Sequence, residues 1–510
     1  MKFFTCNTIK TIDAYTIANE PIASISLMER AAAQLSDWII KRFQKEDAFK
    51  IFVGPGNNGG DGLALARILY KKGFSNVHVY LLSISDKLSP DAEINRKRLI
   101  SESQVIIHPV DSELNFPLLN SKDIIVDALF GSGLSRPLSG LSANLVMFIN
   151  RVQKRLVISI DMPSGLFGED NSGNTLSNVI KSDYTLSFEF PKLSFFFAEN
   201  AETVGDWHVL PIGLHSGFIE NEPTRYNYIW EEDIIAFIKP RKKFSHKGNF
   251  GHGLMIAGSY GMMGASILSS KAALRSGAGL ITTHIPVCGV EIMQVTAPES
   301  LLSIDKNKDF FTDYPLLEKF SAVGIGPGLN KNEDSGKALI RLLAQCKVPV
   351  IIDADAINIL SEMKDWQNLI PESCILTPHP KEFERLFGKF SDSYTRLKTQ
   401  MNFSREKKCI IILKGAHTCI TTPDEQVWFN TTGNPGMATG GSGDVLTGLI
   451  MGLVAQGYSV SDASIIGVYV HGASGDIAAS EKSRHGMIAS DIINNIGTVF
   501  NVLENKRPSS

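Results

Sequence analysis

Short runs of apolar, β-branched residues alternate with amphipathic stretches along the first half of the chain. Between the runs, stretches such as DGLALARILYKKG place apolar residues at positions i, i+3, i+4 and i+7 and stop at a glycine, which predicts helices. The runs themselves predict β-strands, most of them bounded by glycine or acidic residues: KIFVGPG, NVHVYLLS, DIIVDALFG, RLVISIDMPSG and DYTLSFEF. This alternation predicts a parallel sheet covered by helices on both faces.

The same alternation restarts in the second half, which is therefore also predicted to be α/β. Its predicted strands lie in GHGLMIAGS, GLITTHIP, SAVGIGPGL, VPVIIDADAINIL, SCILTPHPKEFERLFG and KKCIIILKGAHTCITTP. A glycine-bearing helical stretch, SGDVLTGLIMGLVAQG, and a further helix around residues 461–480 follow. Residues 215–228 interrupt the pattern, and 510 residues are too many for one ordinary core. We therefore predict two domains, residues 1–215 and residues 225–505.

Composition and charge narrow the class of protein. Hydrophobic residues make up 43% of the chain and charged residues 20%, as in a globular protein, and the net charge of −3 gives no reason to expect nucleic acid or an anionic membrane as a partner. No apolar run reaches the length of about 18 residues that a membrane span needs. The N-terminus lacks the long apolar region of a signal peptide. The six cysteines form no CxxC pair, which indicates reduced thiols in the cytoplasm.

A glycine-rich loop, VGPGNNGGDGLALARIL at residues 53–69, joins a predicted strand to a predicted helix. It satisfies the pattern GxGxxG, but the next strand ends without the acidic residue that would hold a ribose hydroxyl, which argues against a dinucleotide dehydrogenase. No Walker lysine follows, so the loop is not a P-loop. A tight turn before a helix is the structural alternative. Recognition of a polar ligand is favoured by the side chains of Asn57, Asn58 and Asp61.

Other strand ends in the first half also carry polar residues. Asp127 ends one predicted strand before a Gly-Ser-Gly loop, and Asp161 and Ser164 follow another. Ligands bind beyond the carboxyl ends of the strands in an open parallel sheet, so these residues predict a site at that edge. Carboxylate, amide and hydroxyl oxygens also suit a hard cation, and their low total charge allows a monovalent one.

The first half resembles the NAD(P)H-hydrate epimerase family over about residues 1–215, through the motifs GPGNNGGDG, DALFGSGLSRP and DMPSGL in this order and spacing. The resemblance implies a Rossmann-like, three-layer domain with a potassium ion held by Asn58, Asp127 and Ser164. It also implies that the hydrated nicotinamide nucleotide is bound by Asn57, Asn58, Gly59, Gly60, Asp61, Gly131, Ser132, Gly133, Leu134, Ser135, Arg136, Pro137 and Asp161.

Asp161 is the acid–base candidate of this first site. Interconverting epimers at the hydrated carbon needs a proton transfer at the hydroxyl or at the ring. Asp161 stands at a strand end before a flexible Pro-Ser-Gly turn, where it can reach a ligand. The alternative is that Asp161 only orients the turn or the ribose.

A second glycine-rich loop ends in GGSGD and immediately precedes the apolar helix VLTGLIMGLV. Gly441, Ser442 and Gly443 are predicted to present amide groups at a helix N-terminus, which favours binding of an anion. Asp444 has two candidate roles. It caps the helix, or it takes a proton from an attacking hydroxyl while the loop holds a phosphoryl group, the pairing that phosphoryl transfer needs.

Further strand ends in the second half add candidate residues. Lys414 ends a strand and precedes a turn of small residues, where a nucleotide can approach the backbone. His379 stands between two prolines that fix its direction, in a functional or a structural role. Asp353 and Asp355 either face a metal or start a helix, and we favour the start of a helix. Small residues that leave room for a ligand are Ala265 and Gly328.

The second half resembles the ribokinase-like superfamily, and most closely its ADP-dependent NAD(P)H-hydrate dehydratase branch, over about residues 230–500. The motifs are GSYGMMGAS, GIGPGL, DADAIN, LTPHPKEFERL, LKGAHT and NPGMATGGSGDVLTG. The resemblance implies that an adenine nucleotide is bound by Lys414, Gly415, Ala416, His417, Thr418 and Gly443. It implies that the hydrate faces Ala265, Gly328, His379 and Asp444. Fusion to an epimerase half is typical of bacterial bifunctional repair enzymes.

These resemblances imply an enzyme of nicotinamide nucleotide repair, which we expect to be a cytoplasmic homo-oligomer. Its first half is expected to interconvert the R and S hydrates of NADH and NADPH. Its second half is expected to dehydrate the S hydrate with ADP and Mg²⁺: Asp444 deprotonates the ring hydroxyl, which attacks the terminal phosphoryl of ADP, and the ring then expels phosphate and leaves AMP. The alternative is a vitamin or sugar kinase with a non-catalytic N-terminal binding module.

Overall fold

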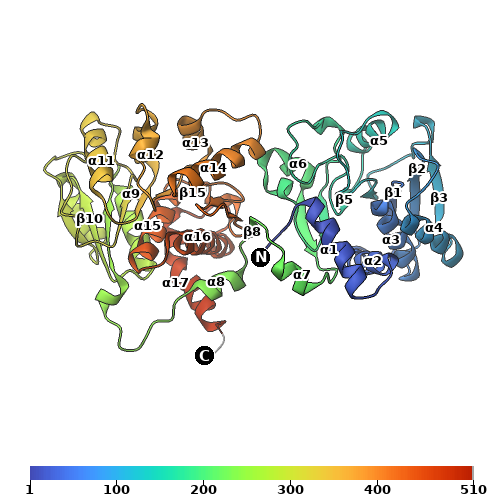
Figure 1. Cartoon of the computed structure of the whole chain (residues 1–510), viewed down its shortest axis with the longest axis horizontal. Coiled ribbons are helices and arrows are strands. Elements are labelled where there is room, and N and C mark those ends of the chain that lie inside the picture. The colour runs from blue at the N-terminus through green and yellow to red at the C-terminus, as the bar shows by residue number, and fades with distance from the viewer. Residues whose placement is uncertain (508–510) are drawn as a thin grey trace. The chain divides into compact units, whose positions relative to one another are not determined.

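The chain folds into two compact units, each with its own sheet (Figure 1). The computed structural model describes residues 1–507. The N-terminal unit consists of Lys2–Thr224 with Asp392–Tyr394, and the C-terminal unit consists of Met1, Arg225–Ser391 and Thr395–Ser510. In the part of the chain that the structure describes, no helix is both long and apolar enough to cross a membrane.

The N-terminal unit is built on a seven-stranded sheet in the order β3-β2-β1-β4-β5-β6-β7, in which all neighbouring strands are parallel. The strands are β1 (Ala48–Val53), β2 (Val77–Leu82), β3 (Ile106–Val110), β4 (Asp123–Ala128), β5 (Leu156–Ile160), β6 (Tyr184–Phe188) and β7 (Asp206–Leu210). The strand order reverses between β1 and β4, and at such a reversal a ligand crevice forms beyond the carboxyl ends of the strands. This is the predicted Rossmann-like arrangement.

Helices cover both faces of this sheet, which confirms the predicted three layers. They are α1 (Cys6–Asn19), α2 (Ser24–Ile40), α3 (Asn57–Lys71), α4 (Pro90–Glu102), α5 (Gly140–Arg151), α6 (Ala201–Val204) and α7 (Ser216–Asn221). One face carries α2, α3 and α4, whose Leu35, Leu63 and Leu99 join buried residues of β1, β2 and β4 in one apolar cluster. The other face carries α5, which contributes Leu145 and Ile149 to a second cluster.

The C-terminal unit is built on a ten-stranded sheet in the order β11-β10-β9-β12-β13-β14-β15-β16-β17-β8. Its strands are β8 (Tyr226–Tyr228), β9 (His252–Ile256), β10 (Leu280–Ile285), β11 (Leu301–Ile304), β12 (Ala322–Ile325), β13 (Val350–Ile352), β14 (Ile375–Leu376), β15 (Ile410–Leu413), β16 (Cys419–Thr421) and β17 (Val427–Phe429). Neighbouring strands are parallel except that β16 runs antiparallel to β15 and to β17. This sheet confirms the second predicted α/β domain.

The helices of the C-terminal unit pack with its sheet to form an apolar core. They are α8 (Glu231–Phe237), α9 (Met263–Arg275), α10 (Val290–Thr296), α11 (Glu333–Gln345), α12 (Ala354–Ser361), α13 (Pro380–Phe387), α14 (Ser393–Lys407), α15 (Ser442–Ala455), α16 (Val460–Lys482) and α17 (Ala489–Asn505). Figure 1 shows α11, α12 and α13 on one side of this unit and α16 and α17 on the other. Buried residues of α9, α15, α16 and α17 form one apolar cluster with the sheet, among them Ala272, Leu449, Ile466 and Ile492.

Helices α9 and α15 cross so closely that their backbones touch. A Cβ on Gly448 of α15 would lie 1.9 Å from the carbonyl oxygen of Ser269 on α9, so only glycine fits there. Gly452, one turn further along α15, lies just as tightly against α9, because its Cβ would be 2.6 Å from the carbonyl oxygen of Ala273. This contact fixes the position of α15, whose N-terminus carries the second glycine loop.

Replacing Gly448 by alanine is expected to destabilise the C-terminal unit by about 1–3 kcal/mol, because the added methyl group overpacks the α9–α15 contact. Gly497→Ala is the matched control: Gly497 lies within α17, a Cβ there meets no atom within 4 Å, and alanine is expected to stabilise the helix by up to ~1 kcal/mol. Urea unfolding of the two variants measures both effects. A Gly448→Ala protein as stable as the control would contradict the close crossing.

Candidate active sites

The turn between β1 and α3 in the N-terminal unit brings two glycines into backbone contact. A Cβ on Gly59 would lie 1.9 Å from the carbonyl oxygen of Gly54, so the contact requires glycine. The predicted substrate segment, residues 57–61, therefore forms the first turn of α3 directly beyond the carboxyl end of β1. Within this turn Asn57 is exposed, whereas the side chains of Asn58 and Asp61 are buried.

The second predicted substrate segment, residues 131–137, follows β4 and ranges from half-buried to exposed. It lies against α3, because a Cβ on Gly131 would be 3.2 Å from the side-chain Oδ1 of Asn58. The Nδ2 atom of Asn58 is buried and has no hydrogen-bond partner among the described residues. Buried amides are normally paired, so this donor marks a place where a ligand oxygen fits. The structure thus brings the two segments together.

Asp127, at the end of β4, is buried and accepts four hydrogen bonds. Its donors are the hydroxyl (2.5 Å) and amide (2.8 Å) of Ser164, the hydroxyl of Ser159 (2.8 Å) and the amide of Leu129 (3.2 Å). Burial raises the pKa of Asp127, although these four hydrogen bonds oppose the rise. The Ser164 hydroxyl also accepts a hydrogen bond from the amide of Phe130 at 2.8 Å. Two of the three predicted potassium ligands, Asp127 and Ser164, are therefore in direct contact.

Asp161 follows β5 with a φ of +63°, a left-handed conformation that is strained for an aspartate. Its Oδ1 accepts a hydrogen bond from Nζ of Lys192 at 2.8 Å, and its Oδ2 accepts one from the amide of Ser132 at 3.2 Å. Burial opposes ionisation of Asp161, but Lys192 and these hydrogen bonds outweigh burial, so the pKa lies below the ordinary value. Asp161 is thus a buried carboxylate in contact with the predicted segment 131–137.

Sequence reasoning missed two residues of this neighbourhood, Lys192 and Asp13. Lys192 is a lone cation within the apolar run FEFPKLSFFF, and such a cation is buried only with a partner, which is the signal that could have found it. Asp13 lies on α1 beside the charges of Asp161, Lys192 and Glu189, and burial followed by Asp161 raises its pKa to about 6. Burial, and then the same Asp161 charge, raises the pKa of Asp61 well above its usual value.

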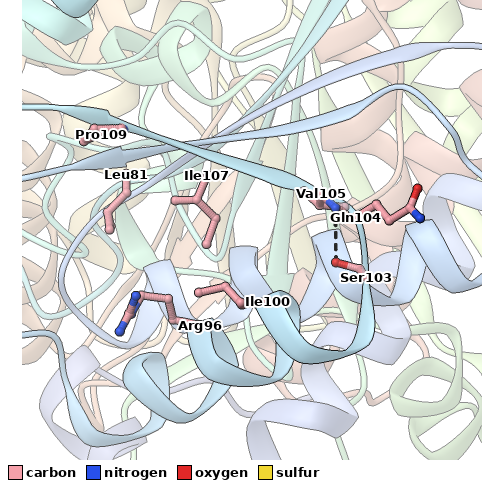
Figure 2. Close-up of a pocket in the computed structure, with 8 residues that line it drawn as sticks. All are labelled: Leu81, Arg96, Ile100, Ser103, Gln104, Val105, Ile107 and Pro109. Carbon is pink, nitrogen blue, oxygen red and sulfur yellow. Dashed lines mark hydrogen bonds between the residues drawn. The ribbon is translucent and has the colours of Figure 1, made fainter.

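A separate surface pocket of about 440 Å³ lies between α4 and the strands β2 and β3, at an edge of this sheet (Figure 2). Figure 2 shows Arg96 and Ile100 of α4 facing Leu81 and Ile107 of the strands. Arg96 is the one charged lining residue, and its guanidinium already pairs with Glu93. The pocket contains no carboxylate and none of the predicted site residues, so we assign it no part in catalysis.

In the C-terminal unit, the second glycine loop ends in the N-terminus of α15. The N-cap is Gly441, with a φ of +89°, and Asp444 is the third residue of the helix. No side chain caps this helix, so the alternative role of Asp444 as the N-cap is wrong. Amides in the first turn of a helix have no acceptor within the helix, so those of Gly443 and Asp444 form an anion-binding end.

Asp353 stands at the start of α12, as expected, but its carboxylate does not cap that helix. Its Oδ1 accepts a hydrogen bond from Nζ of Lys414 at 2.8 Å, and its Oδ2 accepts one from the hydroxyl of Thr447 at 2.6 Å. Lys414 follows β15, and Thr447 lies on α15 one turn after Asp444. Asp353 therefore ties the predicted nucleotide-binding lysine to the helix of the predicted base, a role that sequence reasoning missed.

The carboxyl group of Asp444 is half-buried and titrates near neutrality. Burial first, and then the negative charge of Asp353, raises its pKa to about 7, although Lys414 opposes this rise. Burial alone would lower the pKa of the Lys414 ammonium group. The charges of Asp353 and Glu382 outweigh burial and raise this pKa. Lys414 stays charged at neutral pH, while Asp444 exchanges a proton readily, as a general base requires.

A cavity of about 780 Å³ opens beside Lys414 and the N-terminus of α15, large enough for a nucleotide. Apolar residues such as Met437, Leu446 and Val468 line part of it. The predicted site residues that line it are His379, Lys414, Gly415, Ala416, Thr418 and Gly443. The predicted residues that do not line it are Ala265, Gly328, His417 and Asp444.

His379 has the structural role that the sequence left open for it, and its position leaves it accessible to a ligand. Its Nδ1 accepts hydrogen bonds from the amides of Lys381 and Glu382, which caps α13, and its ring lines the cavity. Burial, Lys414 and Arg385 lower its pKa, so the ring is neutral at pH 7.

Two of the residues outside the cavity, Ala265 and Gly328, lie side by side. A Cβ on Gly328 would be 3.0 Å from that of Ala265, which lies in the first turn of α9. His417, by contrast, directs Nδ1 toward the carbonyl oxygen of Asn430 at 3.2 Å. Two of the four residues predicted to contact the hydrate, Ala265 and Gly328, are therefore neighbours. His417 does not line the cavity but contacts Asn430, which does.

The C-terminal unit thus has the predicted ribokinase-like fold with a nucleotide-sized cavity, and the N-terminal unit is Rossmann-like with a cluster of polar residues of its own. Residues 24–194 match the family described as YjeF-related protein N-terminus, and residues 253–498 match the family described as NAD(P)H-hydrate dehydratase. The chain is 34% identical to the bifunctional NAD(P)H-hydrate repair enzymes of Moorella thermoacetica, over 99% of the chain and 97% of the relative, and of Thermofilum pendens, over 97% and 95%.

A solved structure agrees with these matches. The ADP/ATP-dependent NAD(P)H-hydrate dehydratase from Bacillus subtilis, co-crystallised with ATP and Mg²⁺, superposes with a TM-score of 0.50 and 32% identity, covering 55% of this chain and 99% of that one. The chain belongs to the family of bifunctional NAD(P)H-hydrate repair enzymes.

Replacing Asp353 by asparagine is expected to move the pH dependence of dehydration. The charge of Asp353 raises the pKa of Asp444, so its removal lowers that pKa and shifts the acidic limb of the kcat/KM profile from about pH 7 toward lower pH. Asp355→Asn is the matched control, because Asp355 raises the same pKa by less. Profiles of both variants and the parent measure the shift. An acidic limb that stays in place in Asp353→Asn would refute the coupling.

Proposed function

We propose that the N-terminal domain, with the predicted bounds of residues 1–215, epimerises the R and S hydrates of NADH and NADPH, and that the C-terminal domain, with the predicted bounds of residues 225–505, dehydrates the S hydrate. The second reaction consumes ADP and yields NAD(P)H, AMP and phosphate. The observation that carries the proposal is the position of Asp444. Its carboxyl group, with a pKa of about 7, shares a helix turn with the amide of Gly443, and Gly443 and Lys414 line the cavity.

In the N-terminal unit, residues 57–61 and 131–137 bind the hydrate, and Asp161 faces the reacting ring. The contact between Gly131 and Asn58 supports a shared ligand, and the buried Nδ2 of Asn58 supplies a donor for it. Asp161 accepts and returns the proton that moves during epimerisation. Its hydrogen bond to the amide of Ser132 supports this position beside the substrate segment.

Asn58, Asp127 and Ser164 hold a potassium ion in this unit. Ser164 and Asp127 are in contact and offer a hydroxyl and a carboxylate, and Asn58 adds an amide oxygen. The total charge of these three donors is low, which fits a monovalent ion. Among residues 1–507, no group of three His, Cys, Asp or Glu side chains is arranged to hold a metal ion, as a protein-built divalent site would be. When bound, potassium supplies a fixed positive charge beside the anionic nucleotide.

In the C-terminal unit, Lys414, Gly415, Ala416, His417, Thr418 and Gly443 bind the adenine nucleotide, and Ala265, Gly328, His379 and Asp444 face the hydrate. Open space around Gly415, where a Cβ meets no atom within 4 Å, supports close approach of a nucleotide. Glu382 and Asp353 lie 3.9 and 2.8 Å from Nζ of Lys414, so carboxylate oxygens are present for Mg²⁺ bound with the phosphates. The Mg²⁺ complex of the Bacillus subtilis dehydratase supports this assignment.

The reaction follows from the geometry around Asp444. The carboxylate accepts the proton of the ring hydroxyl while the hydroxyl oxygen forms a bond to the terminal phosphorus of ADP, and the bond from that phosphorus to the bridging oxygen breaks to release AMP. The amides of Gly443 and Asp444 stabilise the phosphoryl oxygens. The ring nitrogen then expels phosphate with the electrons of the carbon–oxygen bond, and loss of a proton from the neighbouring ring carbon restores NAD(P)H.

Further proposals concern the compartment and the assembly. The six cysteines are free thiols, which supports a reducing compartment, the cytoplasm. Apolar side chains on α10 and on the edge strand β11 are largely exposed, with Val295 at 76%, Ile304 at 54% and Leu301 at 51%. Exposed apolar side chains of this kind favour association, so we propose a homo-oligomer.

Replacing Asp444 by asparagine is expected to slow dehydration by roughly 100-fold or more and to spare epimerisation, because the base belongs to one site only. An assay with mixed hydrates and ADP follows AMP, phosphate, the absorbance of reduced nicotinamide and the surviving epimer. Equal loss of both activities would contradict the division of labour. A stable phosphorylated product in place of free phosphate would favour the kinase alternative, whose site needs the same helix end and base.

Replacing potassium by lithium at equal ionic strength is expected to slow the conversion of the R hydrate to the S hydrate by roughly tenfold or more, because the smaller ion does not match the proposed donors. Dehydration of the pure S hydrate, measured in the same buffers, serves as the control and is expected to stay unchanged. Asn58→Ala is expected to weaken the response to potassium. A rate of epimerisation that is indifferent to the cation would overturn the assignment of Asn58, Asp127 and Ser164.

A further inference from the structure

Lys192 is one of the most deeply buried charged side chains of the N-terminal unit, with 1% of its side chain exposed. Its ammonium group donates hydrogen bonds to Oδ1 of Asp161 (2.8 Å), to the hydroxyl of Ser187 (3.0 Å) and to the carbonyl oxygen of Phe190 (3.2 Å). An ammonium group has three protons, so these acceptors satisfy it completely. Lys192 is therefore held in one orientation and contacts a single carboxylate.

A buried ion pair is a poor means of stabilising a fold. Removing two charges from water costs several kcal/mol per ion, and apolar replacements of similar volume are often as stable. The strained backbone of Asp161, with its φ of +63°, adds to the cost of keeping this pair at the end of β5. A pair that adds little stability and sits at a substrate-facing strand end points to a role in the reaction.

The two oxygens of Asp161 have different partners. Oδ1 faces Lys192, and Oδ2 faces the amide of Ser132, within the segment that we assign to the substrate. Because Lys192 engages one oxygen, rotation of the carboxyl group is blocked and the other oxygen stays directed toward segment 131–137. The lysine thus sets the direction in which Asp161 can exchange a proton.

The other titratable side chains near Asp161 are acidic. After burial, the charge of Asp161 contributes to the raised pKa of Asp13 on α1 and of Asp61 on α3. Any of these carboxyl groups that is ionised favours the protonated form of Asp161. Lys192 opposes them all by direct contact.

We propose that Lys192 is a positioning residue for epimerisation, which holds Asp161 as a carboxylate and directs its Oδ2 toward the substrate segment. This inference rests on the proposed acid–base role of Asp161. Lys192 itself transfers no proton, because its three hydrogen-bond acceptors are protein atoms and its side chain is closed to the ligand.

The test is a double-mutant cycle in the full-length protein. The variants are Lys192→Met, Asp161→Asn and the double variant, in which the buried pair is replaced by two neutral side chains. Lys181→Met is the matched control, because Lys181 also pairs with a carboxylate, that of Glu202, but on the surface. Epimerisation of the R hydrate is measured in potassium buffer over a range of pH, and dehydration of the S hydrate is measured in each variant.

Lys192→Met is expected to lower kcat for epimerisation by roughly 100-fold, with little change in KM, and to move the acidic limb of its pH profile to higher pH, because Asp161 then holds its proton more tightly. The double variant is expected to be no slower than Asp161→Asn, since the lysine acts through the aspartate. Lys181→Met and all dehydration rates are expected to match the parent.

Three results would overturn the inference: a Lys192→Met enzyme with the parent kcat, a loss confined to KM, or a loss that adds in full to that of Asp161→Asn. The last of these would mark Lys192 as a structural residue. If Lys192→Met fails to fold, the comparison of Asp161→Asn with the double variant still tests the inference, because a lysine that acts through Asp161 has no further effect once the carboxylate is gone and a slower double variant would overturn it. An Asp161→Asn enzyme that epimerises at the parent rate would instead refute the proposed role of Asp161.

Discussion

Both sites depend on backbone segments that approach each other more closely than any side chain would permit. A Cβ on Gly59 would lie 1.9 Å from the carbonyl oxygen of Gly54, and one on Gly326 would lie 1.8 Å from that of Asp353. Each contact lies at the carboxyl end of parallel strands. Because backbone touches backbone there, polar groups from neighbouring strand ends come within hydrogen-bonding reach of one another. The glycines therefore set the geometry that the reactive side chains use.

Each site also contains a lysine in an ion pair with an aspartate, Lys192 with Asp161 and Lys414 with Asp353, but only in the first pair is the aspartate the proposed base. In the N-terminal unit Lys192 contacts Asp161 directly and favours its ionised form. In the C-terminal unit Lys414 contacts Asp353 at 2.8 Å, and burial and then the charge of Asp353 raise the pKa of Asp444 to about 7, although Lys414 opposes this rise. Burial and the distance from the cation to the carboxyl group thus set the pKa of each proposed base.

The sequence was sufficient for the two α/β folds, most of the inner strands and the glycine loops, because these features depend on local patterns. The four edge strands, β3, β7, β8 and β11, escaped prediction, since an edge strand needs no continuous apolar run, and so did β17, an inner strand of only three residues. The predicted carboxyl-end residues do lie at strand ends, yet their partners were not predicted. Lys192 is 31 residues from Asp161 and Lys414 is 61 residues from Asp353, and only the tertiary fold brings such pairs together.

The different basicities of Asp161 and Asp444 suit the two reactions. Epimerisation is reversible, and the base gives the proton back to the substrate within each turnover. A carboxylate of low pKa, such as Asp161, returns a proton easily and is therefore adequate at the first site. At the second site the hydroxyl must lose its proton permanently as it attacks phosphorus. A base whose pKa is about 7 provides more driving force for that transfer, while part of it remains unprotonated at neutral pH. In the proposed reactions the same residue type can therefore serve both chemistries, because burial and the neighbouring charges differ between the two sites.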